Sequence, residues 1–322
     1  MKITKLSNNF APRHKGIFFG IDTEGTTPTN FVVEIIDADT AEVVATQQLR
    51  EVTSAEVNIA PYLPRFEEYQ PAHALYTTIS DTPYARYKIR VGEVESEAVI
   101  VSVNRIEAGE VPTIITAMPN RRRIYRGECD EVLIITDGGK SISAEITADT
   151  GEQLHIEHYV ATGAGTLTLS TEDFGADIKS LEITLYCEDE VFGRLHYSVK
   201  SAPKTATRLA WLSDAGSIER YTFPVSHKVE RSVERKTALS PEGVQTTLCR
   251  TKLCQSLSSQ FEPSATIKAL AEIASSTKVW VESQEGLKSV EVMSHAIEQN
   301  LFGEPDCVCL DICTPNREES LW

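Results

Sequence analysis

The stretch RLAWLSDAGSIERYTF, residues 208–223, has the pattern of a β-hairpin. Two runs of β-prone residues flank a turn rich in Asp, Gly and Ser, and Gly and Asp tolerate the positive φ that tight reversals require. Leu209 and Trp211 alternate onto one face of the first strand. Tyr221 and Phe223 do the same on the second strand. We therefore expect these four side chains to form one cluster beneath the turn.

Length and composition indicate a folded protein of several domains. The chain has 322 residues, of which 41% are hydrophobic and 24% charged, and this is enough for two or three domains. Its formal net charge of -16 repels polyanions, so we expect no nucleic-acid partner. We interpret the one basic cluster as a solvated face whose charges compensate one another. That cluster comprises Arg121, Arg122, Arg123 and Arg126, beside Glu128, Asp130 and Glu131.

Neither a membrane span nor a secretory signal is predicted. No apolar run approaches the roughly 20 residues that cross a bilayer, so we expect a soluble protein without membrane insertion. The N-terminal sequence MKITKLSNNFAPRHKG has basic residues but no apolar stretch of roughly 7 to 15 residues behind them. We therefore expect the chain to be made in the cytoplasm without a signal peptide.

The cysteines are predicted to be free thiols, because an odd number of them without a secretory signal argues against a disulfide framework. There are seven: Cys129, Cys187, Cys249, Cys254, Cys307, Cys309 and Cys313. None of them has the paired C-x2-C spacing of structural zinc sites. His155 and His158 lie on opposite faces of a predicted strand. We therefore expect no bound metal.

The first two thirds of the chain have the pattern of two β-sandwiches. Short β-branched and aromatic runs recur between turn signals, as in IFFGI at 17–21 and FVVEII at 31–36. No helix-length amphipathic segment separates them, so we predict an immunoglobulin-like sandwich over residues 1–110. A proline after a charged turn marks the boundary, and a second sandwich is predicted over residues 111–207, with turns at DGG, DTG and ATGAG.

Residues 208–322 are predicted to form the aromatic hairpin and a small α+β domain of order ββαβββ. Two polar strands around LSPEG come first, and KVWVES, LKSVEVMS and DCVCLDIC come last. Between them, SATIKALAEIASS predicts a helix with Ser264 as its N-cap after Pro263. Its predicted apolar face comprises Ile267, Leu270, Ala271 and Ala274. The predicted fold class is therefore mainly β with a C-terminal α+β unit.

Two roles are open for the hairpin cluster. It packs only within the hairpin, or it docks the second sandwich against the C-terminal domain and fixes the angle between them. The chain has no nucleophile elbow, phosphate loop, H-E-x-x-H motif or dinucleotide-binding motif. We therefore predict a protein that is not an enzyme and uses no cofactor.

The opening stretch also resembles a motif of structural proteins from tailed phages and prophages of Bacteroidetes. That motif has an aromatic residue and a leucine, a small polar residue, a Gly-centred turn, an acidic residue and alternating aromatics. The matching positions are Trp211, Leu212, Ser213, Gly216, Glu219, Tyr221 and Phe223. In the family a strand pair, a helix and a segment like LAEIASSTKVWVES at 270–283 follow. Ser213 stands where asparagine is expected, and the cysteine-rich end has no counterpart.

The resemblance, which covers residues 208–290, implies a structural virion protein, of the tail, that is made in the host cytoplasm. It implies assembly with copies of itself and with neighbouring virion proteins, a role that suits the edges and loops of sandwiches. The alternative is a bacterial surface adhesin or carbohydrate-binding protein in which Trp211 or Trp280 stacks on sugar rings. The candidate residues for interdomain contact or interaction are Trp211, Tyr221, Phe223 and Trp280.

Overall fold

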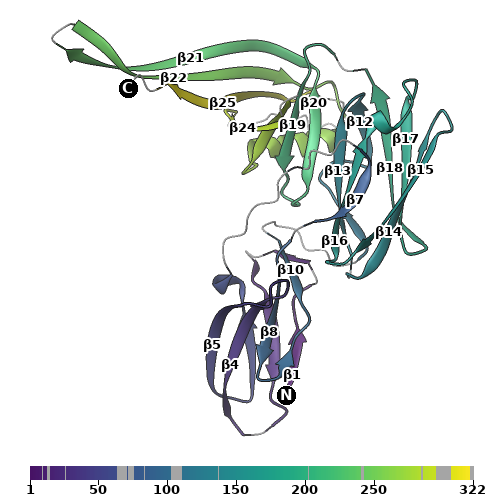
Figure 1. Ribbon diagram of the computed structural model, residues 1–322, viewed down its shortest axis with the longest axis vertical. Helices are drawn as coiled ribbons and strands as arrows, with labels where there is room; N and C mark the ends of the chain where they lie inside the picture. The colour runs from purple at the N-terminus through teal and green to yellow at the C-terminus, as the bar shows by residue number, and fades with distance from the viewer. Residues whose placement is uncertain are drawn as a thin grey trace.

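The computed structural model shows three lobes in which almost all regular structure is β-strand (Figure 1). It describes residues 1–8, 10–12, 15–25, 27–63, 71, 76–82, 84–102, 111–136, 138–201, 203–240, 243–283, 286–294 and 306–319. Of residues 12, 102, 232, 234, 238, 240, 245–250 and 315–319 it describes only the backbone. The α-helix in the described part is α1 (Ser264–Ala271), and three 3-10 turns accompany it: η2 (Ala60–Tyr62), η3 (Thr171–Asp173) and η4 (Glu272–Ala274). The predicted mainly β class with a C-terminal helix is confirmed.

The N-terminal lobe packs two sheets around one apolar core. Its strands are β1 (Lys2–Lys5), β2 (Phe10–Pro12), β3 (Phe18–Asp22), β4 (Thr29–Asp37), β5 (Val43–Val52), β6 (Ser54–Asn58), β8 (Arg86–Val91), β9 (Val94–Glu95) and β10 (Val99–Ser102). One sheet has the order β1-β3-β6 and the other β2-β10-β8-β4-β5, with β9 beside β8. Alternation along β8 buries Tyr87, Ile89 and Val91, so its period-2 pattern supplies an inward face.

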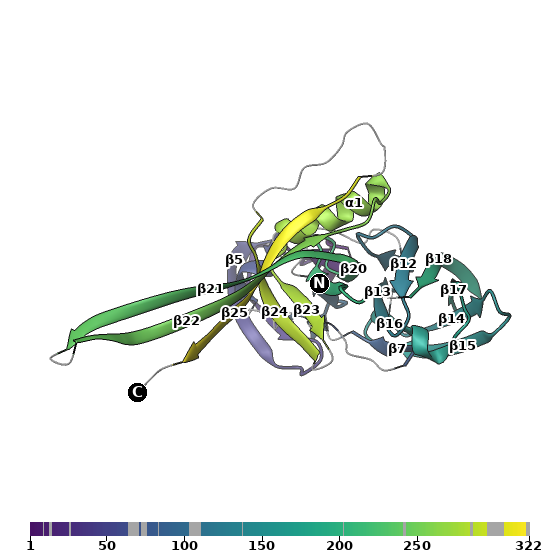
Figure 2. The same ribbon diagram turned by 90° about the horizontal axis from the view of Figure 1, so that it is seen from above.

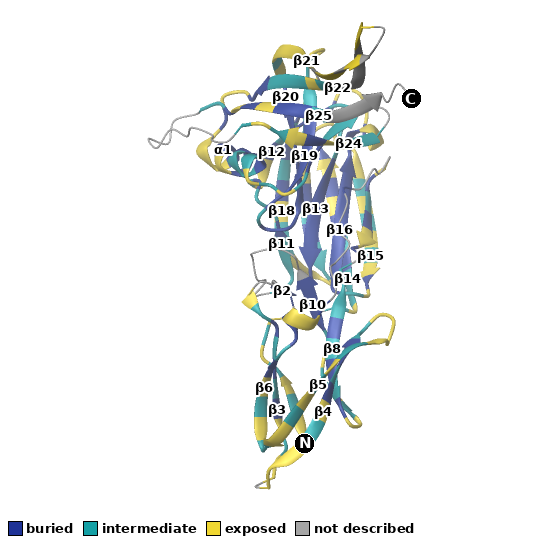
Figure 3. Cartoon of the chain, turned by 90° about the vertical axis from the view of Figure 1, so that its left-hand side faces the viewer, coloured by how far each residue is buried: buried dark blue, intermediate teal, exposed yellow. Residues whose placement is uncertain are grey.

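The middle lobe is a second sandwich-like pair of sheets. Its strands are β7 (Thr78–Asp81), β11 (Thr113–Ile115), β12 (Arg121–Tyr125), β13 (Cys129–Ile135), β14 (Lys140–Ala148), β15 (Gln153–Val160), β16 (Ala164–Ser170), β17 (Ser180–Cys187) and β18 (Glu190–Lys200). The sheet orders are β11-β13-β16-β7 and β12-β18-β17-β14-β15. Figure 3 shows β13 and β16 buried along their length. β7 comes from the range predicted for the first sandwich but pairs with β16, and the predicted boundary at residue 110 lies outside the described residues.

The C-terminal lobe is built on one seven-stranded sheet. Its strands are β19 (Thr207–Leu212), β20 (Ile218–Phe223), β21 (Val225–Ser240), β22 (Gly243–Ser258), β23 (Val279–Ser283), β24 (Gly286–Val292) and β25 (Cys309–Glu319). The sheet order is β20-β19-β23-β24-β25-β22-β21, so the predicted hairpin forms one end of it. After the hairpin the elements follow the predicted order ββαβββ.

Helix α1 differs from its prediction in its cap and in its buried face. Pro263, not Ser264, stands at the N-cap, and no side chain caps the helix there. The buried residues of α1 and η4 are Thr266, Ile267, Ala269, Leu270 and Ile273, whereas Ala271 and Ala274 are half-buried. The buried face is rotated toward Thr266, Ala269 and Ile273, which recur at the spacing of an α-helix.

Strands β21 and β22 form a long hairpin that projects from the body (Figures 1 and 2). Each has 16 residues, which is well beyond the roughly 3 to 10 residues of most strands. The antiparallel register runs from Val225 opposite Ser258 to Ser240 opposite Gly243, with irregularities after Ser226 and Lys236. We call this hairpin, residues 225–258, the arm.

Candidate functional site

The structure brings three of the four predicted interaction residues together. Trp211, Tyr221 and Phe223 belong to one buried cluster with Leu209, which lies opposite Tyr221 in the hairpin. The rings of Tyr221 and Phe223 meet edge to face, with centroids 5.0 Å apart. Trp280 on β23 lies apart from them, in a separate cluster on the other face of the sheet. The four side chains expected beneath the turn therefore do converge.

Trp211 is part of the core of the C-terminal lobe. Its cluster includes Ile267 and Leu270 of α1, and Met118 enters it from the middle lobe. Trp211 is 0% exposed and Trp280 is 8% exposed. Stacking on a sugar ring needs an open aromatic face, and neither tryptophan offers one.

The turn of the hairpin lies where all three lobes meet. Gly216 has φ of 90°, the positive value expected for the turn. The Tyr84 hydroxyl, just before β8, donates a hydrogen bond to the Gly216 carbonyl at 3.1 Å. The apolar cluster around the turn takes residues from every lobe: Phe10, Ile100, Ile115, Leu133, Ile135, Ala164 and Ala215. The hairpin thus contacts the N-terminal lobe through its turn, a contact that the sequence analysis did not predict.

Buried ion pairs join the outer face of the hairpin to the middle lobe. Arg220 Nη2 lies 2.5 Å from Glu131 Oε1, and these side chains are 0% and 2% exposed. Arg208 Nη1 lies 2.6 Å from Glu128 Oε2, and the Thr222 hydroxyl donates to Glu128 Oε1 at 2.5 Å. Burying charges is costly unless they are paired, so this contact requires one relative placement of the two lobes. We call the four charged residues, Arg208, Arg220, Glu128 and Glu131, the junction.

A second buried group lies beside the junction. Asp130 accepts hydrogen bonds from Arg122 at 3.2 Å and from the Tyr197 hydroxyl at 2.8 Å. Glu219 accepts one from the Ala117 N–H at 2.7 Å and lies 3.9 Å from Arg122. Burial raises the pKa of Glu219, and burial likewise raises the pKa of Tyr197. Glu219 therefore ties the hairpin to the segment that enters the middle lobe.

Tyr221 is linked to the middle lobe through Glu262, a residue of its own lobe that precedes α1. That hydroxyl donates to Glu262 Oε1 at 2.9 Å, and Arg123 of β12 lies 2.8 Å from the same oxygen. Burial raises the pKa of Tyr221, which keeps the hydroxyl protonated as a donor. Of the four predicted residues, Tyr221 thus makes a polar link to the middle lobe.

The interpretation of the basic cluster as a solvated face is wrong for Arg122 and its acidic neighbours. Alternation along β12 exposes Arg121 and buries Arg122. Asp130 and Glu131 are buried on opposite faces of β13, because one face packs on the second sheet and the other on the hairpin. Their charges are compensated, as predicted, but inside the protein.

Sequence reasoning missed Arg208 and Arg220 as contact residues. The available signal was their position: they alternate with Leu209, Trp211 and Tyr221, which are core residues on the opposite face. A charged residue in a hairpin that is buried on both faces needs a buried partner of opposite charge. The acidic partners, however, are Glu128 just before β13 and Glu131 on β13, about 80 to 90 residues earlier.

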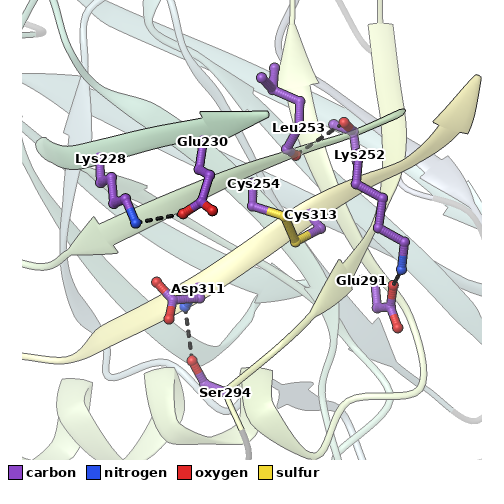
Figure 4. Close-up of a disulfide and its surroundings, with 10 residues drawn as sticks. Lys228, Glu230, Lys252, Leu253, Cys254, Glu291, Ser294, Asp311 and Cys313 are labelled. Atoms are coloured by element: carbon purple, nitrogen blue, oxygen red, sulfur yellow. Dashed lines mark hydrogen bonds and ion pairs between the residues drawn. A yellow bond between two sulfur atoms is a disulfide. The ribbon is translucent and has the colours of Figure 1, made fainter. Parts of the chain in front are cut away.

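The free-thiol prediction is wrong for Cys254 and Cys313, which form a disulfide between β22 and β25 (Figure 4). The antiparallel register places them directly opposite each other, although 59 positions separate them in the sequence. Nearby, Lys252 lies 2.9 Å from Glu291 of β24. The base of the arm is therefore joined to the sheet by a covalent bond as well as by strand pairing.

Four further cysteines form no disulfide within the described part of the chain: Cys129, Cys187, Cys307 and Cys309. The side chain of Cys249 lies outside the described part. Within the described ranges, no three His, Cys, Asp or Glu side chains lie close enough together to hold a metal ion. His158 lies 3.4 Å from Asp81 across the two sheets of the middle lobe.

Comparison with known proteins yields similarity of structure only. No protein-family model and no curated protein sequence matches the chain. Among solved structures, domains 4–9 of the surface layer protein SbsC match at 11% identity and a TM-score of 0.21, over 98% of this chain and 43% of that one. A bacterial ice-binding adhesin matches at 9% identity and a TM-score of 0.19, over 80% of this chain and 90% of that one. A marsupial T cell receptor matches at 9% identity and a TM-score of 0.21, over 98% of this chain and 92% of that one.

The chain thus spans less than half the length of the surface layer structure. TM-scores this low carry no inference about function. None of the helices among the described residues has the length and apolar content that a membrane span requires.

Proposed function

We propose that this chain is a non-enzymatic structural subunit of a phage or prophage particle. In this proposal it is a tail component that assembles with copies of itself and with neighbouring virion proteins. Its N-terminal and middle lobes serve as immunoglobulin-like sandwiches that carry contact edges and loops. The proposed role requires no cofactor and no nucleic-acid contact.

The observation that carries this proposal is the contrast between a closed body and an open arm. The charged side chains of the junction and its neighbours are used inside the molecule, where they fix the lobes against one another. The arm, in contrast, extends away from the body (Figure 2). Most of its described residues are exposed. A rigid body with a projecting strand pair suits a subunit whose partners are other protein surfaces.

The adhesin or carbohydrate-binding alternative receives less support. It assigned sugar stacking to Trp211 or Trp280, and both rings are buried. Sugar binding at these positions would require the C-terminal lobe to open, which would expose its core.

Electron microscopy tests the proposal. Gold-labelled antibodies against the purified chain are expected to decorate the tails of particles released from the host after prophage induction. Labelling confined to the bacterial surface would overturn the proposal in favour of the adhesin. A glycan array serves as the second measurement, because specific sugar binding that is lost in a folded Trp280→Ala variant would also contradict it.

A further inference from the structure

The outer strand of the arm has an open edge. β21 is the last strand of the seven-stranded sheet, with β22 on its inner side and no partner strand on its outer side in the described part of the chain. Its unpaired N–H and C=O groups form a ready template for another polypeptide. β25 pairs with β22 only as far as Cys249, so the outer part of the arm is a two-stranded hairpin, which is only marginally stable without further packing. The arm therefore has both a free edge and a need for a covering surface.

One face of β21 combines apolar and basic side chains. Val229, Arg231, Val233 and Arg235 alternate with the other face and are all exposed. Val229 and Val233 are 59% and 44% exposed. Neither arginine makes an ion pair with a residue in the described part of the chain. We call these four residues the arm face.

The arm face continues a surface that is covered in the body. In register with Val229 lie Gln255 of β22 and then Ile312 of β25. Ile312 is 2% exposed and belongs to the core around Trp211. Farther out the same side of the sheet has no covering element among the described residues, which leaves its valines in water.

The charge of the arm is opposite to that of the rest of the protein. Residues 225–258 contain six basic and three acidic residues, a net charge of +3. Because the whole chain has a net charge of -16, the remaining residues carry -19. Two arms repel each other, whereas an arm attracts the body of another copy. The arm's own body is out of reach, because the arm points away from it and the disulfide and β25 hold its base (Figures 1 and 4).

We infer that the arm face of one copy binds the acidic body of a second copy. This inference rests on the proposed function, since it names the partner in self-assembly. Arm and body are different surfaces, so the contact is head-to-tail, and its repetition from copy to copy generates a ring or a filament. The valines supply apolar contact area, and the arginines select an acidic partner.

Sedimentation velocity of the purified full chain, over a range of protein and salt concentrations, tests this inference. The Arg231→Glu/Arg235→Glu variant is expected to associate at least about tenfold more weakly than the wild type. The matched control is Lys228→Glu/Lys252→Glu, which changes the net charge equally but on the other face of the arm. Association of the wild type is expected to weaken as salt rises. Equal loss in both variants, or no loss in either, would overturn binding through the arm face.

A crosslinking experiment tests where the arm binds. With the photoreactive residue p-benzoylphenylalanine in place of Val233, crosslinks are expected to the regions 1–224 or 259–322 of another copy. Crosslinks to residues 225–258 of another copy would refute the head-to-tail arrangement. A wild type that stays monomeric at all concentrations would contradict self-assembly itself, whereas assembly that is unchanged by Arg231→Glu/Arg235→Glu would contradict only the role of the arm.

Discussion

Removing one charge of the Arg220–Glu131 pair is expected to destabilise the protein severely. The two side chains lie 2.5 Å apart and are 0% and 2% exposed, so water cannot replace a lost partner. In Glu131→Gln, Arg220 loses the carboxylate at 2.5 Å, while Glu282 lies farther away, at 3.9 Å. Loss of one partner of a buried pair costs about 3–5 kcal/mol. We expect the free energy of unfolding to fall by that amount.

The double variant Glu131→Met/Arg220→Met separates the charge effect from packing. Replacing both partners by apolar residues of similar size is commonly neutral or stabilising, so its cost should be far below the sum of the two single variants. Lys140→Met is the control, because Lys140 and Glu188 form a pair that is 38% and 57% exposed. That variant should cost only about 0–1 kcal/mol.

Guanidinium unfolding followed by tryptophan fluorescence is the assay. Trp211 and Trp280 both lie in the C-terminal lobe, next to the junction, so their emission reports on the structure that the ion pair supports. The slope of the transition must be unchanged for the comparison to hold. If Glu131→Gln costs no more than Lys140→Met, the argument that the junction holds the lobes in place is refuted.

Three further outcomes are expected. Trp211→Ala should lower the free energy of unfolding by about 3–5 kcal/mol, because the side chain is buried in the core. The control Phe261→Ala, at a side chain 72% exposed, should change this free energy by no more than about 0.5 kcal/mol. Similar values for the two variants would contradict the core position of Trp211. Peptide mapping without reductant should recover a crosslink between Cys254 and Cys313, and replacing both by Ser should cost about 2–4 kcal/mol in non-reducing denaturant titrations. Burial raises the pKa of Glu219 above its ordinary value of 4.5, so its contribution to stability is fully present below pH 4.5 and is lost as the pH rises through the folded-state value. The unfolding free energy of the wild type minus that of Glu219→Gln should therefore fall as the pH rises from 4.5, and a rise would show that the carboxylate is stabilised in its charged form.

Local pattern predicted the hairpin and the helix because their determinants lie within a few residues of one another. The turn at 213–217 needs Gly216 at positive φ, and the cluster around Trp211 follows from alternation along two adjacent strands. Ser264 as N-cap failed for a similarly local reason, since Pro263 already occupies that position. Such features depend on the backbone more than on distant partners.

The features that could not be predicted from the sequence depend on contacts between segments that lie far apart in the chain. Cys254 bonds to Cys313 because β22 and β25 are neighbours in the sheet. The spacing of the cysteines in the sequence does not indicate this strand order. Glu131 was interpreted as solvated because its partner, Arg220, lies on another lobe. Both arm strands were expected, but their projection depends on β21 being the edge of a sheet whose order emerges from the whole lobe.

The placement of charge connects the junction to the proposed assembly. A head-to-tail contact builds a regular ring or filament only if every copy holds its arm at the same angle to its body. An apolar interface between lobes tolerates small slides, because its contacts are not directional. Arg220 and Glu131 do not tolerate them, since a shift of a few ångströms leaves a buried charge without its partner. On the proposed function, the buried pairs therefore set the angle of the arm, and the exposed arginines of the arm face select the surface that it meets.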